Sequence, residues 1–274
     1  MNPARAVAIG AFKHLAPLRQ AYFSLAERQH RSRLARAAEE SAGREREGYL
    51  SLLERGWHVM PNFWSAADAL TVRQRLESSC GAAGAQSEHH PYLGSNRYYH
   101  VERDVPELGT NFKEHPFLLA VARGFNGHIP AGRRTMYQHT VYDPAVAQHY
   151  ERDIGLSSGP TPISPRFHFD FMRHTLKAAL YLSDVRLENG PTEFCLLPDD
   201  ERGHRVRASR KAKQVAYLRK YFDRRVGAED TIWTHYEARA LELASFAQPL
   251  VGQAGTLVIF DTFTVHRAAE PRAG

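Results

Sequence analysis

The stretch Pro165–Arg173, which reads PRFHFDFMR, contains the pattern on which the interpretation of the whole chain depends. His168 and Asp170 are two positions apart, and alternate residues of a β-strand point to the same face of the sheet. An imidazole and a carboxylate on one face supply two ligands of a metal site, and His266, which follows the apolar stretch 255–261, is the candidate for the third. Two histidines and one carboxylate that leave the other coordination positions open form the facial triad of non-haem Fe(II) oxygenases.

The composition is that of one large folded domain. The chain has 274 residues, of which 43% are hydrophobic, and this content suffices for a sizeable core. No apolar run reaches the roughly 18 residues that a transmembrane helix needs, so we expect no membrane span. The two cysteines, Cys80 and Cys195, exclude a disulfide framework and a zinc ribbon, and they predict a cytoplasmic protein. Because the chain contains 15 histidines, a histidine pair is informative only with its spacing and context.

Residues 1–47 are predicted to form a basic helical extension to a domain that covers residues 48–274. Glu27 is the only acidic residue before Glu39, whereas arginine and lysine recur throughout this part of the chain. Arginine-rich starts that lack acidic residues also occur in organelle transit peptides. We favour a packed helical extension, held by apolar side chains such as Phe23 and Leu25, because no cleavage pattern is evident.

Alternation of apolar and polar residues predicts the strands of the domain. Strands are expected around residues 56–63, 97–101, 134–142, 175–183, 192–197 and 255–261, and helices over 65–80 and 116–125. Ser65 followed by Asp68 is typical of a helix N-terminus. Residues 81–94, which include His89 and His90, are expected to form a surface loop.

A helical, basic insertion at about 199–250 interrupts the strand pattern. Between residues 201 and 225 the only acidic residues are Glu201 and Asp223. Two interpretations stay open: the insertion is a solvated lid, or it is a platform for an anionic substrate such as a phosphate or a carboxylate. Nucleic acid is not expected as a partner, because few aromatic residues are interleaved with the basic ones.

In their order along the chain, these motifs resemble the phytanoyl-CoA dioxygenase family of Fe(II)/2-oxoglutarate oxygenases. The order is HFD at 168–170, LKAALYLSDV at 176–185, ENGP at 188–191 and GTLVIFD at 255–261, which precedes His266. The resemblance extends from about residue 48 to the end and excludes the basic insertion. It implies a mostly β chain with flanking helices (α+β), whose core is a double-stranded β-helix, also called a jelly roll.

The resemblance also implies the chemistry. His168, Asp170 and His266 would be the metal ligands and the catalytic residues, and the cofactors would be Fe(II), 2-oxoglutarate and O2. The reaction implied is hydroxylation of a C–H bond in a small-molecule substrate, with succinate and CO2 as co-products. Asp170 favours hydroxylation, because related halogenases carry a small residue at this position.

In the family an arginine about ten residues beyond the distal histidine binds the far carboxylate of 2-oxoglutarate, a task suited to its planar, bidentate group. The sequence ends eight residues after His266, so we expect a C-terminal truncation that removes this arginine and the last strand of the core. Arg272 is the nearest candidate, although its spacing differs. Lys177, Tyr181 and Thr140 are further candidates for contacts with the co-substrate.

Two other functions remain open at this point. The chain could be a cupin-like metalloenzyme that does not use 2-oxoglutarate, or a non-catalytic jelly-roll module that binds an anionic ligand. The presence of all three ligands, His168, Asp170 and His266, argues for an enzyme over a binding module. The motifs leave the substrate and the oligomeric state open.

Overall fold

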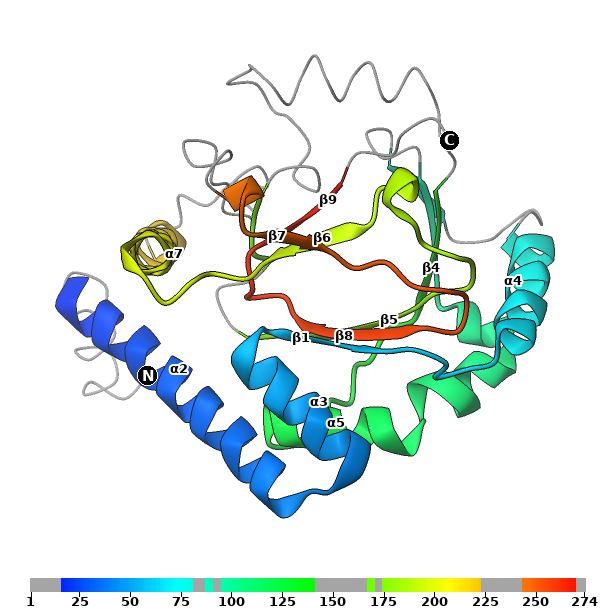
Figure 1. Ribbon diagram of the computed structural model, residues 1–274, viewed down its shortest axis with the longest axis horizontal. Helices are drawn as coiled ribbons and strands as arrows, with labels where there is room; N and C mark the ends of the chain where they lie inside the picture. The colour runs from blue at the N-terminus through cyan, green and yellow to red at the C-terminus, as the bar shows by residue number, and fades with distance from the viewer. Residues whose placement is uncertain are drawn as a thin grey trace, which may run out of the picture.

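The computed structural model describes residues 16–80, 87–90, 95–140, 167–170, 174–222 and 243–269. It is a mixed structure of helices and antiparallel sheets (Figure 1). Helices contribute more of the described residues than strands do, so the expectation of a mostly β chain is corrected to a mixed one. The presence of flanking helices agrees with the sequence prediction, and the strand pairs are antiparallel.

The strands form three sheets of three strands each among the described residues. The first has the order β1 (Trp57–Met60), β8 (Leu257–Asp261), β5 (Leu176–Leu180). The second has the order β7 (Ala247–Pro249), β6 (Thr192–Cys195), β9 (His266–Ala268). The third has the order β2 (Ser87–His90), β3 (Ser95–Tyr99), β4 (Met136–Thr140).

Helices surround these sheets. They are α2 (Ala16–Glu40), α3 (Gly43–Glu54), α4 (Ala66–Cys80), α5 (Pro116–Asn126) and α7 (Glu201–Phe222). Short turns of helix lie at Val101–Arg103, Leu108–Lys113 and Leu187–Asn189. Helices α2, α3 and α5 lie on the side of the β1–β8–β5 sheet that faces away from the β7–β6–β9 sheet (Figure 1). None of the described helices combines the length and the apolar character that crossing a bilayer requires.

Strand β8 is buried on both faces, which explains its nearly continuous apolar sequence, LVIFD. Leu257 and Ile259 pack into the cluster formed with the helices. Val258 points the other way and packs with Trp57 and Phe194, where the two facing sheets meet. The strand therefore separates a helical core from an inner core between sheets.

Helix α2 is an integral part of the packing. Its buried residues Phe23, His30, Leu34 and Ala38 recur at helical spacing, so one stripe of the helix faces the protein. Leu25 is 50% exposed, so the expectation that it packs the extension is wrong. The boundary expected between residues 47 and 48 falls inside α3, and the division into extension and domain stays a prediction.

The local predictions near α4 and β2 have different outcomes. The hydroxyl of Ser65 accepts a hydrogen bond from the Asp68 backbone N–H at 3.1 Å, which caps α4 as the sequence indicates. The loop expected over 81–94 is wrong for residues 87–90, which form β2 and pair with β3. Helix α7 begins at Glu201, within the helical insertion expected at about 199–250.

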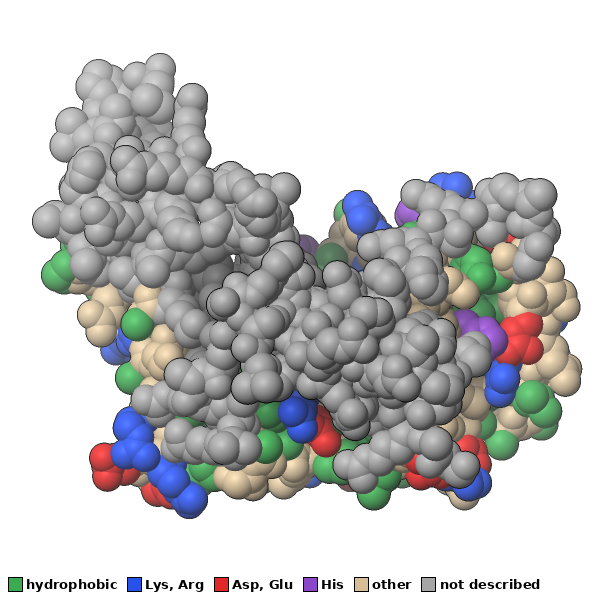
Figure 2. Space-filling view, turned by 90° about the horizontal axis from the view of Figure 1, so that it is seen from above, with side chains coloured by type: hydrophobic (Ala, Val, Ile, Leu, Met, Phe, Trp, Pro, Cys, Tyr) green, Lys and Arg blue, Asp and Glu red, His purple; other side chains and the backbone are tan. Residues whose placement is uncertain are grey.

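The described arginines of the basic insertion have acidic partners nearby. Arg202 pairs with Asp200, Arg205 with Glu201 and Arg207 with Asp199, at 2.9, 2.7 and 3.5 Å. On the face shown in Figure 2, basic and acidic side chains of the described residues lie next to one another at the rim. These three arginines at the start of the insertion are therefore paired with acidic residues, and the anionic platform stays a proposal.

A substitution at Gly56 tests the close approach between the α3–β1 turn and the chain before β9. Gly56 has φ of +88°, and an added Cβ would overlap the side chain of Thr264. We expect Gly56→Ala to lower the free energy of unfolding by about 1–3 kcal/mol, the usual cost of such a strained backbone. Denaturant unfolding measures this, with Gly132→Ala as control because no atom lies within 4 Å of its added Cβ. Equal stabilities of the two variants would contradict the packing described.

Candidate metal centre

The backbone brings the three predicted ligands together. His168 and His266 form an isolated antiparallel bridge, in which the N–H of each donates to the carbonyl of the other at 2.9 Å. The N–H of Asp170 donates to the carbonyl of Thr262, also at 2.9 Å. Segment 167–170 therefore lies against the turn that joins β8 to β9, and ligands far apart in sequence become neighbours.

The ligand atoms have the spacing of a metal site. Nε2 of His168 and Nε2 of His266 each lie 3.4 Å from the same atom, Oδ1 of Asp170. Ligand atoms about 2.1 Å from an ion lie roughly 3.0–3.4 Å from one another. The two imidazole planes are inclined by 50° with centroids 4.4 Å apart, so in-plane lone pairs of both rings can converge on one point.

The charge distribution also fits a cation. Two imidazole nitrogens and a carboxylate oxygen are acceptors in their usual states at neutral pH, and acceptors in contact repel one another unless a proton or a cation lies between them. All three side chains are at least nine-tenths buried, so water screens this repulsion little.

Hydrogen bonding and packing fix the orientation of His266. Its Nδ1 lies 2.7 Å from the carbonyl of Thr264, which can only accept, so Nδ1 carries the proton and Nε2 faces Asp170. Its ring stacks on Phe194 at a centroid distance of 5.1 Å and an interplanar angle of 18°. The imidazole is therefore held in the tautomer and the direction that a metal ligand needs.

Asp170 uses its two oxygens differently. Oδ1 faces the histidines, whereas Oδ2 accepts a hydrogen bond from the ammonium group of Lys177. Burial by itself raises the pKa of Asp170, but the neighbouring His168 and His266 and the charge of Lys177 outweigh it and lower that pKa. Asp170 is therefore a carboxylate at neutral pH.

The other predicted cofactor contacts have different outcomes. Lys177 lies against Asp170, and the hydroxyl of Tyr181 donates to the carbonyl of Leu250 at 2.7 Å. Burial raises the pKa of Tyr181, so this phenol stays neutral. Thr140 ends β4 with its side chain outside the described residues, and Arg272 lies wholly outside them. Contacts of these four residues with a co-substrate stay predictions.

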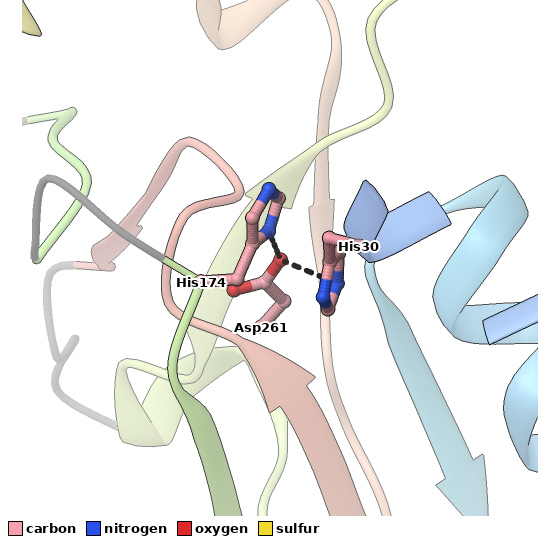
Figure 3. A group of neighbouring side chains, drawn as sticks. All are labelled: His30, His174 and Asp261. Atoms are coloured by element: carbon pink, nitrogen blue, oxygen red, sulfur yellow. Dashed lines mark hydrogen bonds and ion pairs between the residues drawn. The ribbon is translucent and has the colours of Figure 1, made fainter. Parts of the chain in front are cut away.

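A second polar cluster, not predicted from the sequence, is formed by His30 of α2, His174 and Asp261 of β8 (Figure 3). Nδ1 of His174 bonds Oδ2 of Asp261, and Nε2 of His30 lies 3.9 Å from the same oxygen. The one available signal was Asp261 itself, a carboxylate that ends an apolar, buried strand.

The second cluster differs from the first in the arrangement of its rings. The imidazoles of His30 and His174 are stacked, with centroids 3.8 Å apart and planes inclined by only 13°. A metal ion lies close to the plane of each imidazole that binds it. The planes of His30 and His174 are nearly parallel and do not intersect near the rings, so one ion cannot lie in both planes. This geometry is a hydrogen-bonded stack, so we place the candidate metal centre at His168, Asp170 and His266.

No protein-family model and no curated protein matches the chain. Solved structures are similar. The non-heme alpha ketoglutarate dependent carbocyclase SnoK from nogalamycin biosynthesis is 17% identical, with 86% of this chain and 80% of that chain covered and a TM-score of 0.50. The epimerase SnoN, solved with Fe3+, alpha ketoglutarate and nogalamycin RO, is 13% identical, with 84% and 78% covered and a TM-score of 0.50. The chain shares their fold. The resemblance to the phytanoyl-CoA dioxygenase family itself rests on the sequence motifs alone.

Replacing Lys177 tests the charge balance of the centre. Lys177→Met removes the cation that neutralises Asp170, and a lost hydrogen bond of this charged kind costs about 1–2 kcal/mol when one partner is half-exposed. A bound divalent ion supplies positive charge in its place. We therefore expect the variant to melt at a lower temperature than wild type without metal, and to be stabilised more by Ni2+.

Thermal unfolding with and without Ni2+ measures both effects. The same increase in melting temperature for variant and wild type would show that Lys177 does not balance the charge of Asp170.

Proposed function

We propose that this chain is an Fe(II)- and 2-oxoglutarate-dependent oxygenase that hydroxylates a C–H bond of a small organic substrate. The observation that carries the proposal is the convergence of His168 and His266 on one oxygen of Asp170. Two histidines and a carboxylate with open positions are typical of non-haem Fe(II) oxygenases. The fold shared with the alpha ketoglutarate dependent SnoK and with SnoN, which was solved with alpha ketoglutarate, supports the same class.

Each residue has a role in this proposal. His168, Asp170 and His266 would hold Fe(II), which supplies the activation of O2 together with 2-oxoglutarate. The Thr264 carbonyl keeps His266 in its ligand tautomer. Lys177 keeps Asp170 ionised and occupies its second oxygen, so that one oxygen of the carboxylate faces the metal position.

The finer assignment is also part of the proposal. The order of motifs from HFD at 168–170 to GTLVIFD at 255–261 supports a phytanoyl-CoA dioxygenase-like protein with a jelly-roll core. The facing β1–β8–β5 and β7–β6–β9 sheets, with apolar side chains between them, are consistent with that core. The substrate would be a small molecule, and a cytoplasmic location fits the sequence composition.

The outcome of the oxidation needs its own measurement, because SnoN is an epimerase and SnoK is a carbocyclase. Asp170 supports hydroxylation over halogenation. The mass of the product separates the remaining outcomes: hydroxylation adds one oxygen atom, epimerisation leaves the mass unchanged, and ring closure removes two hydrogen atoms.

Loss of a ligand tests the metal centre and the reaction together. Loss of a residue that only contacts a metal ligand weakens metal binding by roughly 10–100-fold. His168 and Asp170 are ligands themselves, so we expect His168→Ala and Asp170→Ala to weaken Ni2+ binding by more than this. Succinate release with Fe(II), 2-oxoglutarate and a panel of candidate substrates should fall to background. His58→Ala is the matched control, because His58 is a half-buried histidine of β1 outside both clusters.

Calorimetric titration and succinate quantification are the readouts. If Asp170→Ala bound Ni2+ and released succinate like wild type, the proposed function would be wrong.

A further inference from the structure

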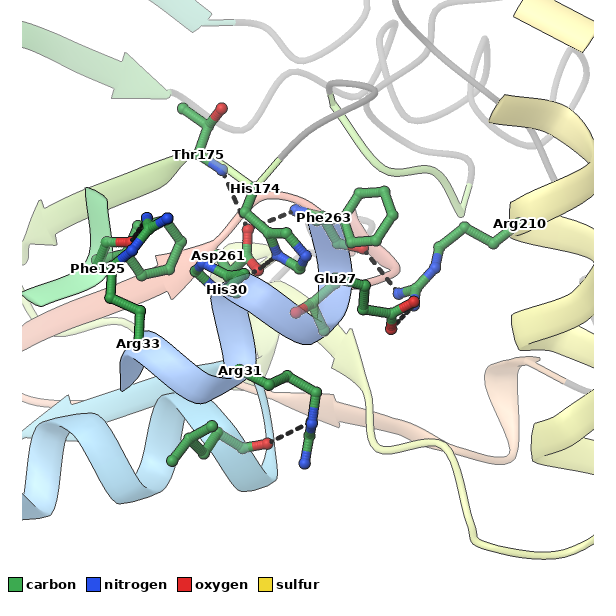
Figure 4. Close-up of polar contacts among 12 residues, drawn as sticks. Glu27, His30, Arg31, Arg33, Phe125, His174, Thr175, Arg210, Asp261 and Phe263 are labelled. Atoms are coloured by element: carbon green, nitrogen blue, oxygen red, sulfur yellow. Dashed lines mark hydrogen bonds and ion pairs between the residues drawn. The ribbon is translucent and has the colours of Figure 1, made fainter. Parts of the chain in front are cut away.

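Asp261 forms hydrogen bonds with two chain segments: the one that follows Asp170 and the turn that precedes His266. Its Oδ1 accepts hydrogen bonds from the backbone N–H of Thr175 at 3.2 Å and of Phe263 at 3.0 Å. Its Oδ2 accepts from Nδ1 of His174. One buried carboxylate therefore binds both the chain after Asp170 and the turn before His266 (Figures 3 and 4).

The turn that Asp261 organises contacts two of the candidate ligands directly. The carbonyl of Thr262 accepts from the N–H of Asp170 at 2.9 Å, and the carbonyl of Thr264 accepts from His266 at 2.7 Å. Thr264 in turn donates its N–H to the carbonyl of Asp261 at 3.0 Å. A shift of this turn would therefore move both ligands relative to His168.

Helix α2 contacts Asp261 through His30. His30 lies 3.9 Å from the carboxylate and stacks on His174, and it is only 7% exposed. Burial and the neighbouring His174 lower the pKa of His30 to about 3, so its ring is neutral and stacks without charge repulsion. The position of α2 is thereby coupled to the orientation of His174 and Asp261.

Helix α7 contacts the turn 261–264 through Arg210. The guanidinium of Arg210 lies 4.1 Å from the centroid of the Phe263 ring and donates to the Phe263 carbonyl at 3.2 Å. It also pairs with Glu27 of α2 at 3.3 Å, which closes a ring of contacts through both helices (Figure 4). The turn 261–264 is fixed by helices that lie far apart in sequence.

The cluster of His30, His174 and Asp261 contains a feature that lowers the stability of the fold. Nε2 of His174 is buried and has no hydrogen-bond partner among the described residues, and such a group costs about 1–3 kcal/mol. A buried polar network with an unsatisfied member is also often no more stable than apolar side chains of the same volume. The polar trio therefore fits a role in fixing direction better than a role in packing.

We propose that Asp261, oriented by His174 and His30, is the positioning residue of the metal centre. It acts through the turn 261–264, which directs Asp170 and His266 toward His168, and it does not itself contact the metal. This inference rests on the proposed function, because it assumes that the three residues bind a divalent metal.

Cobalt binding tests the inference without any need for a substrate. Co2+ replaces Fe(II) as a stable ion whose visible absorption reports coordination geometry. Asp261→Asn keeps the size of the side chain but replaces the oxygen that His174 binds by an amide donor, and His30→Ala removes the contact from α2. We expect Asp261→Asn to weaken Co2+ binding by about 10–100-fold and to change the absorption bands, with a smaller loss in the same direction for His30→Ala.

The matched control is His115→Ala. His115 caps α5 by accepting from the N–H of Phe117, so its loss should destabilise the protein away from the turn 261–264. We expect a lower melting temperature with the Co2+ affinity and spectrum of wild type. A general effect of destabilisation would instead weaken Co2+ binding in this variant too, and would overturn the inference.

Three other results decide between the inference and its alternatives. Wild-type Co2+ affinity and spectrum in folded Asp261→Asn or His30→Ala would overturn it. Two Co2+ ions per wild-type chain, with one in His30→Ala, would also overturn it and identify the trio as metal ligands. Unchanged Co2+ binding in His168→Ala would refute the proposed function itself, whatever Asp261 does.

Discussion

The pair of backbone hydrogen bonds between His168 and His266 is the constraint on which the centre depends. It fixes the register between segment 167–170 and the start of β9, and a shift by one residue would turn one imidazole to the opposite face of the sheet. The bond from Asp170 to the Thr262 carbonyl extends the same pairing. Convergence of the side chains is thus a consequence of main-chain pairing, and the inclined rings and the shared carboxylate oxygen follow from it.

Much of this arrangement could be predicted from the sequence, since it depends on short-range pattern. The alternation after Thr175 predicts β5, Ser65 predicts the start of α4, and the apolar run before Asp261 predicts a buried strand. The proximity of His168, Asp170 and His266 was also expected from residue type and order. These features follow from the periodicity of strands and from the ligand preferences of metals, which are visible in a linear sequence.

The remaining features depend on contacts between distant segments, and no local pattern encodes them. His30 lies in an arginine-rich helix with nothing to mark it, yet it is buried against Asp261 because α2 packs against α3, α5 and α7 next to the end of β8. Residues 87–90 resembled a loop, because a short polar strand acquires its identity only when β3 pairs with it. Lys177 was expected beside a co-substrate, but it contacts Asp170. This contact depends on how the chain between the two residues folds, which no local pattern shows.

Strand β8 has a further consequence for how such a protein can change over evolutionary time. Its side chains alternate between the helical core and the inner core, and it ends at Asp261, so the two cores share one short piece of backbone. A substitution that suits a new helix arrangement would displace the apolar side chains of the inner core between the sheets as well. Sequence drift in the helices and diversification of the chemistry are therefore coupled, and freedom to vary lies mainly in segments that do not touch this strand.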